Sequence, residues 1–228
     1  MKLALFDLDG TLIDSEAGIL GSIEFALNTL GAAIPARDEL RSWIGPPLRA
    51  TFPRVLGEGA PDVECAVALY RERFSAQGWR EHTVYIGIDA AIAALHAHGV
   101  QLAVVTSKSS EYASRIVDSL PFGACFARVY AVHPDSAHSE KTEMIAQALV
   151  DFAVPAQAAT MIGDRRFDIE GARANGVRAV GVTWGFGSRG ELESAGADAI
   201  ATDAAELLRI LLGDAATARV VAACDADG

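Results

Sequence analysis

The chain begins with a short apolar run that ends in two acidic residues. Residues 3–6 (Leu-Ala-Leu-Phe) are followed by Asp7-Leu8-Asp9-Gly10-Thr11, which predicts a buried strand that closes in a turn. Because residues two apart share one side of an extended chain, Asp7 and Asp9 are expected to leave the strand end together. Two such charges about 4 Å apart repel by roughly 4 kcal/mol at an effective dielectric near 20. This repulsion calls for a cation or a shared proton, unless the two acids merely lie in a solvated turn.

The next 70 or so residues show helical periodicity. Apolar residues recur at helical spacing from Ser15 to Leu30, and Gly31 ends this predicted helix. Further helices are predicted over residues 37–44, 48–56 and 62–77. Breakers at 45–47 (Gly-Pro-Pro) and 57–61 (Gly-Glu-Gly-Ala-Pro) separate them. The pattern therefore predicts an all-helical block, residues 15–83, inserted after the first strand.

Beyond residue 83 the predicted strands alternate with helices. Strands are expected over 100–106, 128–132, 159–162, 177–182 and 198–201. Helices are expected over 87–98, 110–120, 140–152, 167–175, 189–195 and 204–212. This alternation is typical of an α/β fold whose parallel sheet is covered by helices on both faces. Residues 1–14 and 84–228 are therefore expected to form one discontinuous domain, although the Ala-rich tail after Gly213 has no evident role.

Composition and net charge argue against several classes of binding partner. The formal net charge of −11 argues against nucleic acid or an anionic membrane as the main partner. No apolar stretch approaches the ~20 residues of a membrane helix, and the N-terminal residues lack a signal-peptide pattern. Cys65, Cys125 and Cys224 are widely spaced and odd in number, which indicates neither a disulfide framework nor a zinc site. We therefore expect a cytoplasmic protein; the oligomeric state is not predictable.

Four polar clusters follow predicted strands or begin predicted helices. They are Asp7/Asp9, Thr106-Ser107-Lys108, Lys141, and the run Gly163-Asp164-Arg165-Arg166-Phe167-Asp168. Ligands of open parallel sheets bind at the carboxyl ends of the strands. Each cluster also has a simpler interpretation: Thr106 or Ser107 as a helix cap, Lys141 as a surface lysine, and Asp164 and Asp168 as helix N-terminal acids. Lysine is scarce, since Lys2, Lys108 and Lys141 are the three in the sequence.

The order of these clusters is more specific than any one of them. Asp-x-Asp-Gly-Thr, then Thr, then Lys, then Gly-Asp-x-x-x-Asp resembles the haloacid dehalogenase-like hydrolase superfamily, in its phosphoglycolate phosphatase-like branch. The resemblance extends over residues 1 to about 212. It implies a doubly wound, Rossmann-like core with an inserted helical cap, and a phosphatase that hydrolyses a small phosphorylated metabolite.

The resemblance also implies a role for each matching residue. Asp7 is the expected nucleophile, which forms an aspartyl-phosphate, and Asp9 is the expected general acid/base. Thr106, with Ser107, would bind the transferring phosphoryl group, and Lys141 would neutralise charge on Asp7 and the phosphate. Mg²⁺ is the expected cofactor, with ligands from the Asp7 carboxylate, the Asp9 backbone carbonyl and Asp164, and with Asp168 as a direct or outer ligand.

Some positions depart from the common pattern of the branch. Arg165 stands where many relatives carry Ser or Thr, and Thr142 follows Lys141 where Pro is frequent. Both variations, and the run at 171–176 (Gly-Ala-Arg-Ala-Asn-Gly), resemble a 5′-nucleotidase-like subgroup. The loop at 184–187 (Trp-Gly-Phe-Gly) either frames the site or packs on the core. In the expected cap, Arg49 is the candidate contact for a substrate anion, and a plain surface arginine is the alternative.

Several other functions compete with a phosphatase. A dehalogenase would lack the second carboxylate, and a phosphonate hydrolase of this family needs a cap lysine, which residues 15–84 do not contain. A sugar phosphomutase is the main alternative, although such enzymes more often have Val or Ile at the position of Thr11. A phospho-aspartate signalling module or a non-catalytic binding protein is more distant. The sequence does not discriminate between phosphoglycolate, nucleoside monophosphates and sugar phosphates.

Overall fold

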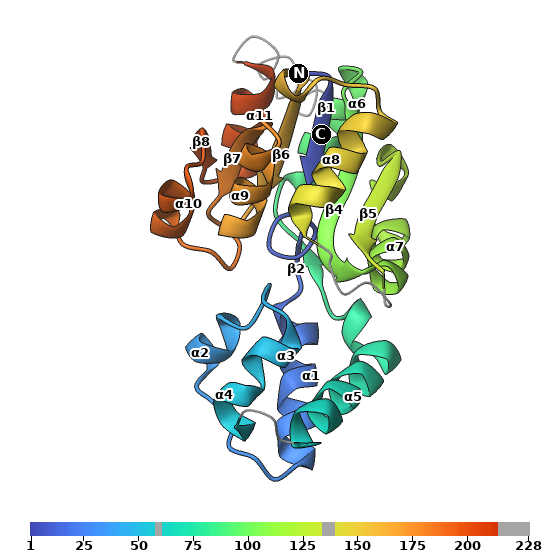
Figure 1. Cartoon of the computed structure of the whole chain (residues 1–228). Helices are drawn as coiled ribbons and strands as arrows, with labels where there is room; N and C mark the ends of the chain where they lie inside the picture. The colour runs from blue at the N-terminus through green and yellow to red at the C-terminus, as the bar shows by residue number, and fades with distance from the viewer. Residues whose placement is uncertain (58–60, 134–139, 214–228) are drawn as a thin grey trace. The chain divides into compact units, whose positions relative to one another are not determined.

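The computed structural model describes residues 1–57, 61–133 and 140–213, and its chain divides into two compact units (Figure 1). One unit contains Met1–Ile13 and the chain from Val84 onward, and the other contains Asp14–Thr83. The short strands β2 (Ile13–Asp14) and β3 (Thr83–Val84) pair with each other where the chain passes from one unit to the other. The tail after Gly213, for which no role was evident, lies outside the described residues.

The first unit is built on a six-stranded parallel sheet. Its strands are β1 (Leu3–Phe6), β4 (Gln101–Ser109), β5 (Arg128–Val132), β6 (Ala159–Gly163), β7 (Arg178–Val182) and β8 (Ala199–Ala201). They lie in the order β5-β4-β1-β6-β7-β8, and all the pairs are parallel. The order reverses direction beside β1, so the residues that follow β1 lie at the switch point where ligands of such sheets bind.

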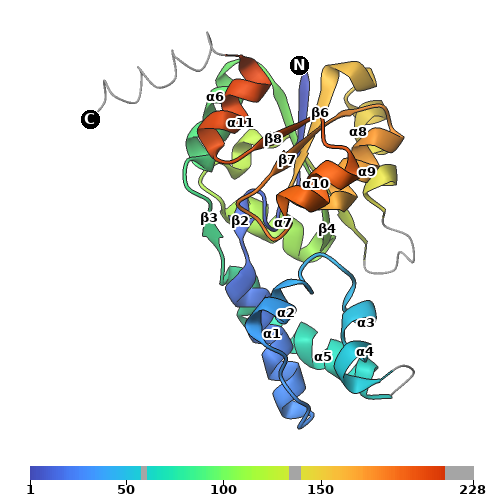
Figure 2. The same ribbon diagram turned by 90° about the vertical axis from the view of Figure 1, so that its left-hand side faces the viewer.

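Helices cover both faces of this sheet (Figure 2). One face carries α8 (Lys141–Asp151), α9 (Arg166–Ala174) and α10 (Arg189–Ala195), with α9 packed on β6 and β7. The other carries α6 (Ile88–Ala97), α7 (Ser110–Ser119) and α11 (Ala204–Leu212), with α6 packed against α11. The predicted α/β class is therefore confirmed, together with the order of its strands and helices along the chain.

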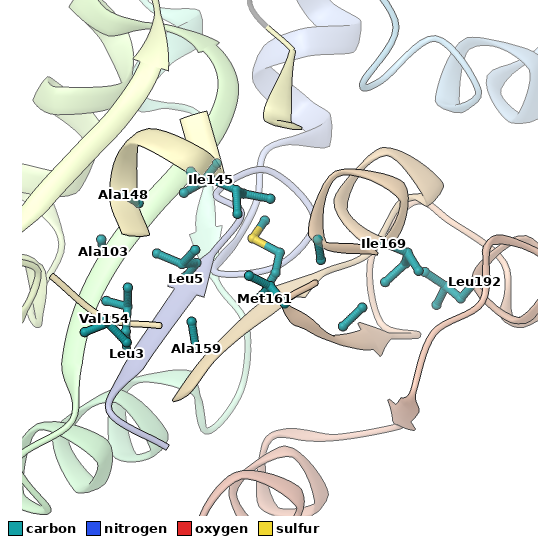
Figure 3. Close-up of a cluster of buried hydrophobic side chains, with 14 residues drawn as sticks. Leu3, Leu5, Ala103, Ile145, Ala148, Val154, Ala159, Met161, Ile169 and Leu192 are labelled. Atoms are coloured by element: carbon teal, nitrogen blue, oxygen red, sulfur yellow. The ribbon is translucent and has the colours of Figure 1, made fainter. Parts of the chain in front are cut away.

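The buried core beneath α8 and α9 shows which way β1 presents its side chains (Figure 3). Leu3 and Leu5 of β1 lie with Ile145 of α8 and Ile169 of α9 in one cluster. All four side chains are fully buried. Because side chains alternate along a strand, the next residue of the same parity, Asp7, faces the α8/α9 side of the sheet.

The second unit is helical. It contains α1 (Glu16–Thr29), α2 (Arg37–Arg41), α3 (Leu48–Thr51), α4 (Pro53–Leu56), α5 (Pro61–Ala76) and the 3₁₀ turn η1 (Gly78–Arg80). The long helices α1 and α5 pack together, and Arg73 of α5 donates hydrogen bonds to Glu81 and to Ser22 of α1. No helix in the described part of the chain combines the length and apolar character needed to cross a membrane.

The helical unit departs from the sequence prediction at one element. A single helix was expected over residues 48–56, and the structure instead has α3 and α4, which meet at Phe52 and Pro53. Proline has no backbone N–H and is tolerated in the first turn of a helix, so Pro53 begins a new helix. The 48–56 prediction missed this break because it followed apolar spacing alone.

The core beneath α8 yields a stability prediction. We expect Ile145→Ala to lower the free energy of unfolding by about 2–5 kcal/mol, because it leaves a cavity between α8 and the sheet. Val150→Ala is the matched control on the same helix, since Val150 is 74% exposed, and its effect is expected within about 0.5 kcal/mol. Urea denaturation of both variants measures the difference. Equal losses would contradict the assigned core.

Candidate active site

The Asp7 carboxylate lies at the carboxyl end of β1 and contacts the first residue of α8. Lys141 Nζ is 2.7 Å from Asp7 Oδ2, and it also forms an ion pair with Asp168 of α9. The other oxygen, Asp7 Oδ1, accepts a 2.8 Å hydrogen bond from the backbone N–H of Leu8. Asp7, Lys141 and Asp168 are all buried. The alternation along β1 thus places a carboxylate oxygen in a buried position beside a lysine.

Asp164 joins Asp7 and Asp168 in an acidic cluster. Their carboxylate oxygens lie within 4.8 Å of one another. Asp164 follows β6, and its two oxygens accept hydrogen bonds from Thr11 Oγ1 (3.3 Å) and from the backbone N–H of Phe186 (2.8 Å). Gly10 has a φ of +84°, and a Cβ there would collide with the Asp164 carboxylate. The Gly-Thr pair after Asp9 is therefore required both for the turn and for the close approach of Asp164.

Asp168 is held from two sides in the first turn of α9. Its Oδ2 accepts a 3.0 Å hydrogen bond from the backbone N–H of Arg165, and its Oδ1 contacts Lys141. Glycine at 163 leaves room for this carboxylate, since a Cβ at that position would overlap it. Asp168 therefore orients the lysine that contacts Asp7, in addition to offering an oxygen to the cluster.

Burial and mutual repulsion shift the proton affinities of this cluster. Burial, with the charges of Asp168 and Asp164, raises the pKa of Asp7 to about 8 against the attraction of Lys141. Burial and Asp168 likewise raise the pKa of Asp164 to about 7, although the hydrogen bond from Phe186 opposes the shift. Burial alone would lower the pKa of Lys141, but Asp168 and Asp7 outweigh it and raise that pKa overall. The cluster thus holds more carboxylate than its own lysine neutralises.

The donor set suits a hard divalent cation. All three residues offer carboxylate oxygens, the ligands that Mg²⁺ prefers. Lys141 contacts two of the three carboxylates and offsets one of their negative charges, so a divalent cation would balance the other two. A divalent cation beside Asp7 and Asp164 would oppose the effect of burial, which raises the pKa of both carboxyl groups.

The Asp9 carboxylate is not one of the three in this cluster, although Asp7 and Asp9 were expected to leave the strand end together. The chain turns after Leu8, whose carbonyl accepts hydrogen bonds from the N–H groups of Leu12 and Ile13. This turn ends the strand alternation on which the expectation relied. The Asp9 carboxylate instead pairs with Lys108, whose Nζ lies 2.9 Å from Oδ2 and 3.1 Å from Oδ1. Sequence reasoning noted Lys108 as one of three lysines but assigned it no role.

The remaining core residues of the expected site lie at the end of β4. Thr106 is buried, and its Oγ1 accepts a 3.2 Å hydrogen bond from the backbone N–H of Lys108. Ser107, between them, is exposed. Thr106 pairs with Ala131 of β5, and β4 pairs with β1 from Gln101 to Val104. Thr106 and Lys108 therefore lie in the last part of the strand that neighbours β1.

Arg49 was the expected substrate contact in the helical unit, and it already has a carboxylate partner there. Its Nε and Nη2 donate hydrogen bonds of 2.7 and 2.9 Å to the two oxygens of Glu64 on α5. Both side chains are more than half exposed. In the same unit, Glu16 is mostly buried and pairs with Arg37 and Arg41 of α2. The cysteines at 65 and 125 are free, as their spacing predicted.

The loop at 184–187 frames the site, one of the two alternatives that its sequence allowed. Besides the bond from Phe186 to Asp164, Trp184 Nε1 donates a 3.1 Å hydrogen bond to the backbone carbonyl of Thr11. Arg165 and Thr142, which depart from the common family pattern, also form hydrogen bonds. Arg165 Nε donates to Glu191 at 2.9 Å, and Asn175 Nδ2 donates to the backbone carbonyl of Thr142 at 2.9 Å. These contacts link α9 to α10 and to the first turn of α8.

Comparison with known proteins gives one family and several close relatives. The family model for haloacid dehalogenase-like hydrolases matches residues 4–182. A 5′-nucleotidase of Pseudomonas aeruginosa is 39% identical over 207 residues, which are 91% of this chain and 94% of the relative. A predicted phosphatase from Clostridium acetobutylicum has a solved structure that superposes with a TM-score of 0.84 at 34% identity, covering 92% of this chain and 98% of that one.

A further relative carries a different activity in its name. The tyrosine-protein kinase PtkA of Mycobacterium tuberculosis is 38% identical over 186 residues, which are 82% of this chain. The chain spans 63% of the length of that relative. The family match includes all four motif clusters, the whole helical unit and the other unit as far as Val182. The chain is a member of the haloacid dehalogenase-like hydrolases, as its motifs predicted.

Proposed function

We propose that this protein is a Mg²⁺-dependent phosphomonoester hydrolase that works through an aspartyl-phosphate on Asp7. The observation that carries the proposal is the buried contact of Asp7 with Lys141, next to Asp164 and Asp168. Phosphoryl transfer depends mainly on positioning and on neutralising charge around the phosphoryl oxygens. A buried carboxylate beside a lysine and an acidic cluster that fits a divalent cation supply both requirements.

Each residue of the core site has a task in this reaction. Asp7 attacks phosphorus with its free lone pairs, while the hydrogen bond from Leu8 fixes the orientation of its carboxylate. Lys141 neutralises negative charge on Asp7 and on the bound phosphoryl group, and Asp168 holds the lysine in place. Thr106 and Ser107 bind phosphoryl oxygens from the end of β4. Asp9 protonates the leaving oxygen in the first step and takes a proton from water in the second.

The metal would be held by the Asp7 and Asp164 carboxylates and the Asp9 backbone carbonyl, with Asp168 as a further ligand. Mg²⁺ bound there supplies positive charge to the transferring phosphoryl group. Thr11 and Phe186 orient Asp164 for this purpose. Asp168 also contacts Lys141 through one oxygen and the N–H of Arg165 through the other, so it holds the lysine in place as well as the metal.

The helical unit, residues 15–83, is proposed as the cap that excludes water and selects the leaving group. Arg49 is the proposed contact for a substrate anion. To reach one, it must exchange its two hydrogen bonds with Glu64 for contacts with the substrate. Both side chains are exposed, so the ion pair is worth little in water and the exchange is inexpensive.

A nucleoside 5′-monophosphate is the proposed substrate class. The 5′-nucleotidase of P. aeruginosa is matched over nearly its whole length. The two departures from the common family pattern, Arg165 and Thr142, also resemble the 5′-nucleotidase-like subgroup. Both observations favour nucleotides over phosphoglycolate.

Phosphorylation of protein tyrosine is the second candidate function, because of the similarity to PtkA. Both activities transfer a phosphoryl group, and they differ in the acceptor, which is water in one case and a tyrosine hydroxyl in the other. The chain matches part of that relative's length and nearly all of the 5′-nucleotidase. We therefore place hydrolysis first.

Replacement of the nucleophile tests the mechanism. We expect Asp7→Asn to lower phosphate release at least about a thousandfold, because an amide cannot attack phosphorus. Circular dichroism should show an unchanged fold, since the substitution is close to isosteric. Turnover at the wild-type rate would mean that the nucleophile is another residue. Activity that persists in EDTA would separately refute the proposed metal.

The electrostatics of the cluster predict how metal-free stability depends on pH. A carboxyl whose pKa is raised in the folded state destabilises that state as pH rises past its ordinary value. In EDTA we expect Asp164→Asn to be more stable than wild type by about 1–3 kcal/mol at pH 8, and by less at pH 5, where Asp164 is protonated in the fold. Adding Mg²⁺ should stabilise wild type alone. The exposed Asp118→Asn on α7 is the control, and an equal gain there would contradict the repulsion.

A substrate panel separates the proposed classes. We expect kcat/KM for at least one nucleoside 5′-monophosphate to exceed that for phosphoglycolate and for hexose phosphates by about tenfold or more. Release of inorganic phosphate with Mg²⁺ present is the measurement. Phosphoglycolate as the best substrate would overturn the nucleotide assignment. Transfer from ATP to protein tyrosine, without release of phosphate from any monoester, would favour the kinase instead.

A further inference from the structure

Asp9 and Lys108 form an ion pair that lies outside the acidic cluster. The ammonium of Lys108 is within hydrogen-bonding distance of both Asp9 oxygens, at 2.9 and 3.1 Å. The Lys108 side chain is 8% exposed and the Asp9 side chain is 17% exposed. A single donor shared by both oxygens leaves the carboxylate little freedom to rotate. The ion pair therefore holds the Asp9 carboxylate in a defined position, unlike a mobile contact on the surface.

The backbone of β4 determines where Lys108 lies. The pairing of β4 with β5 is regular up to Thr106 and resumes at Ser109, with a shift of register between them. The N–H of Lys108 lies in this irregular stretch and donates to Thr106 Oγ1. Thr106 is buried and thus fixed. A bulge of this kind re-aims side chains, so the residue proposed to bind phosphate also anchors the lysine that holds Asp9.

Each of the two aspartates in the first motif contacts a different lysine. Lys141 contacts Asp7 and Asp168, whereas Lys108 contacts Asp9. Asp9 is only two residues from Asp7. Without Lys108, its carboxylate would be drawn towards the positive charge of Lys141. The competing lysine on β4 keeps the general acid/base separate from the nucleophile.

We propose that Lys108 is a positioning residue that holds the Asp9 carboxylate in place to activate water. The proposal rests on the proposed function. In the second half of the reaction, Asp9 takes a proton from water and the water oxygen forms a bond to phosphorus. The bond from phosphorus to the Asp7 oxygen breaks, which returns the Asp7 carboxylate and releases inorganic phosphate, and the proton remains on Asp9. Without Lys108 the Asp9 carboxylate is no longer oriented, so hydrolysis of the aspartyl-phosphate is slower.

The test uses p-nitrophenyl phosphate, whose leaving group departs without a proton. With Lys108→Met, we expect a rapid burst of about one p-nitrophenolate per enzyme, followed by slow turnover, because Asp7 is still phosphorylated while hydrolysis of the intermediate is impaired. The steady-state kcat should fall at least about tenfold. KM should fall with it, so that kcat/KM changes by less than about threefold. Lys108→Arg, which keeps a cation, should recover part of kcat.

Lys2→Met is the matched control, since Lys2 is exposed and lies at the amino end of the sheet; we expect wild-type kinetics. Lys108→Gln serves as a second variant if circular dichroism shows that Lys108→Met is misfolded. Wild-type kcat in a folded Lys108 variant, or a parallel fall of kcat and kcat/KM without a burst, would overturn the proposal. An inactive wild type would refute the proposed function and this inference with it. Activity that depends on Asp7 but not on Lys108 would refute the inference alone.

Discussion

Repulsion among three buried carboxylates is the constraint on which this structure depends. The carboxylate oxygens of Asp7, Asp164 and Asp168 lie within 4.8 Å of one another, and all three residues are buried. Such a cluster costs free energy unless positive charge offsets it. Lys141 supplies part of that charge from the first turn of α8. In the proposed function, the remaining negative charge binds a cation beside the carboxylate that receives the phosphoryl group.

Each layer of the fold contributes one part of this arrangement. Asp7 follows β1 and Asp164 follows β6, while Lys141 is the first residue of α8 and Asp168 lies in the first turn of α9. The chain turns after Leu8, and the Asp9 carboxylate forms an ion pair with Lys108 of β4. The fold thus sorts six charged side chains into two groups, and the groups match the two roles of the proposed reaction, nucleophile with metal and acid/base.

The sequence predicted the architecture well because periodicity is a local property. The order of strands and helices, and the placement of Asp7, Lys141 and Asp164 at strand ends or helix starts, follow from short windows of residues. Contacts between distant residues were missed. Asp9 and Lys108 are 99 positions apart, and their pairing depends on a turn after Leu8 and a register shift in β4 that apolar spacing does not reveal. The partnership of Arg49 with Glu64 depends likewise on how α3 meets α5.

The central claim is that Asp7 carries the phosphoryl group during turnover. The most direct measurement is rapid acid quench during hydrolysis of a phosphomonoester, followed by borohydride reduction and mass spectrometry of the peptide that contains residues 3–11. The account predicts that acyl-phosphate, and hence the reduced side chain, appears at Asp7 alone and requires both substrate and Mg²⁺. Reduction at another carboxylate, or none at all under conditions of steady turnover, would contradict it.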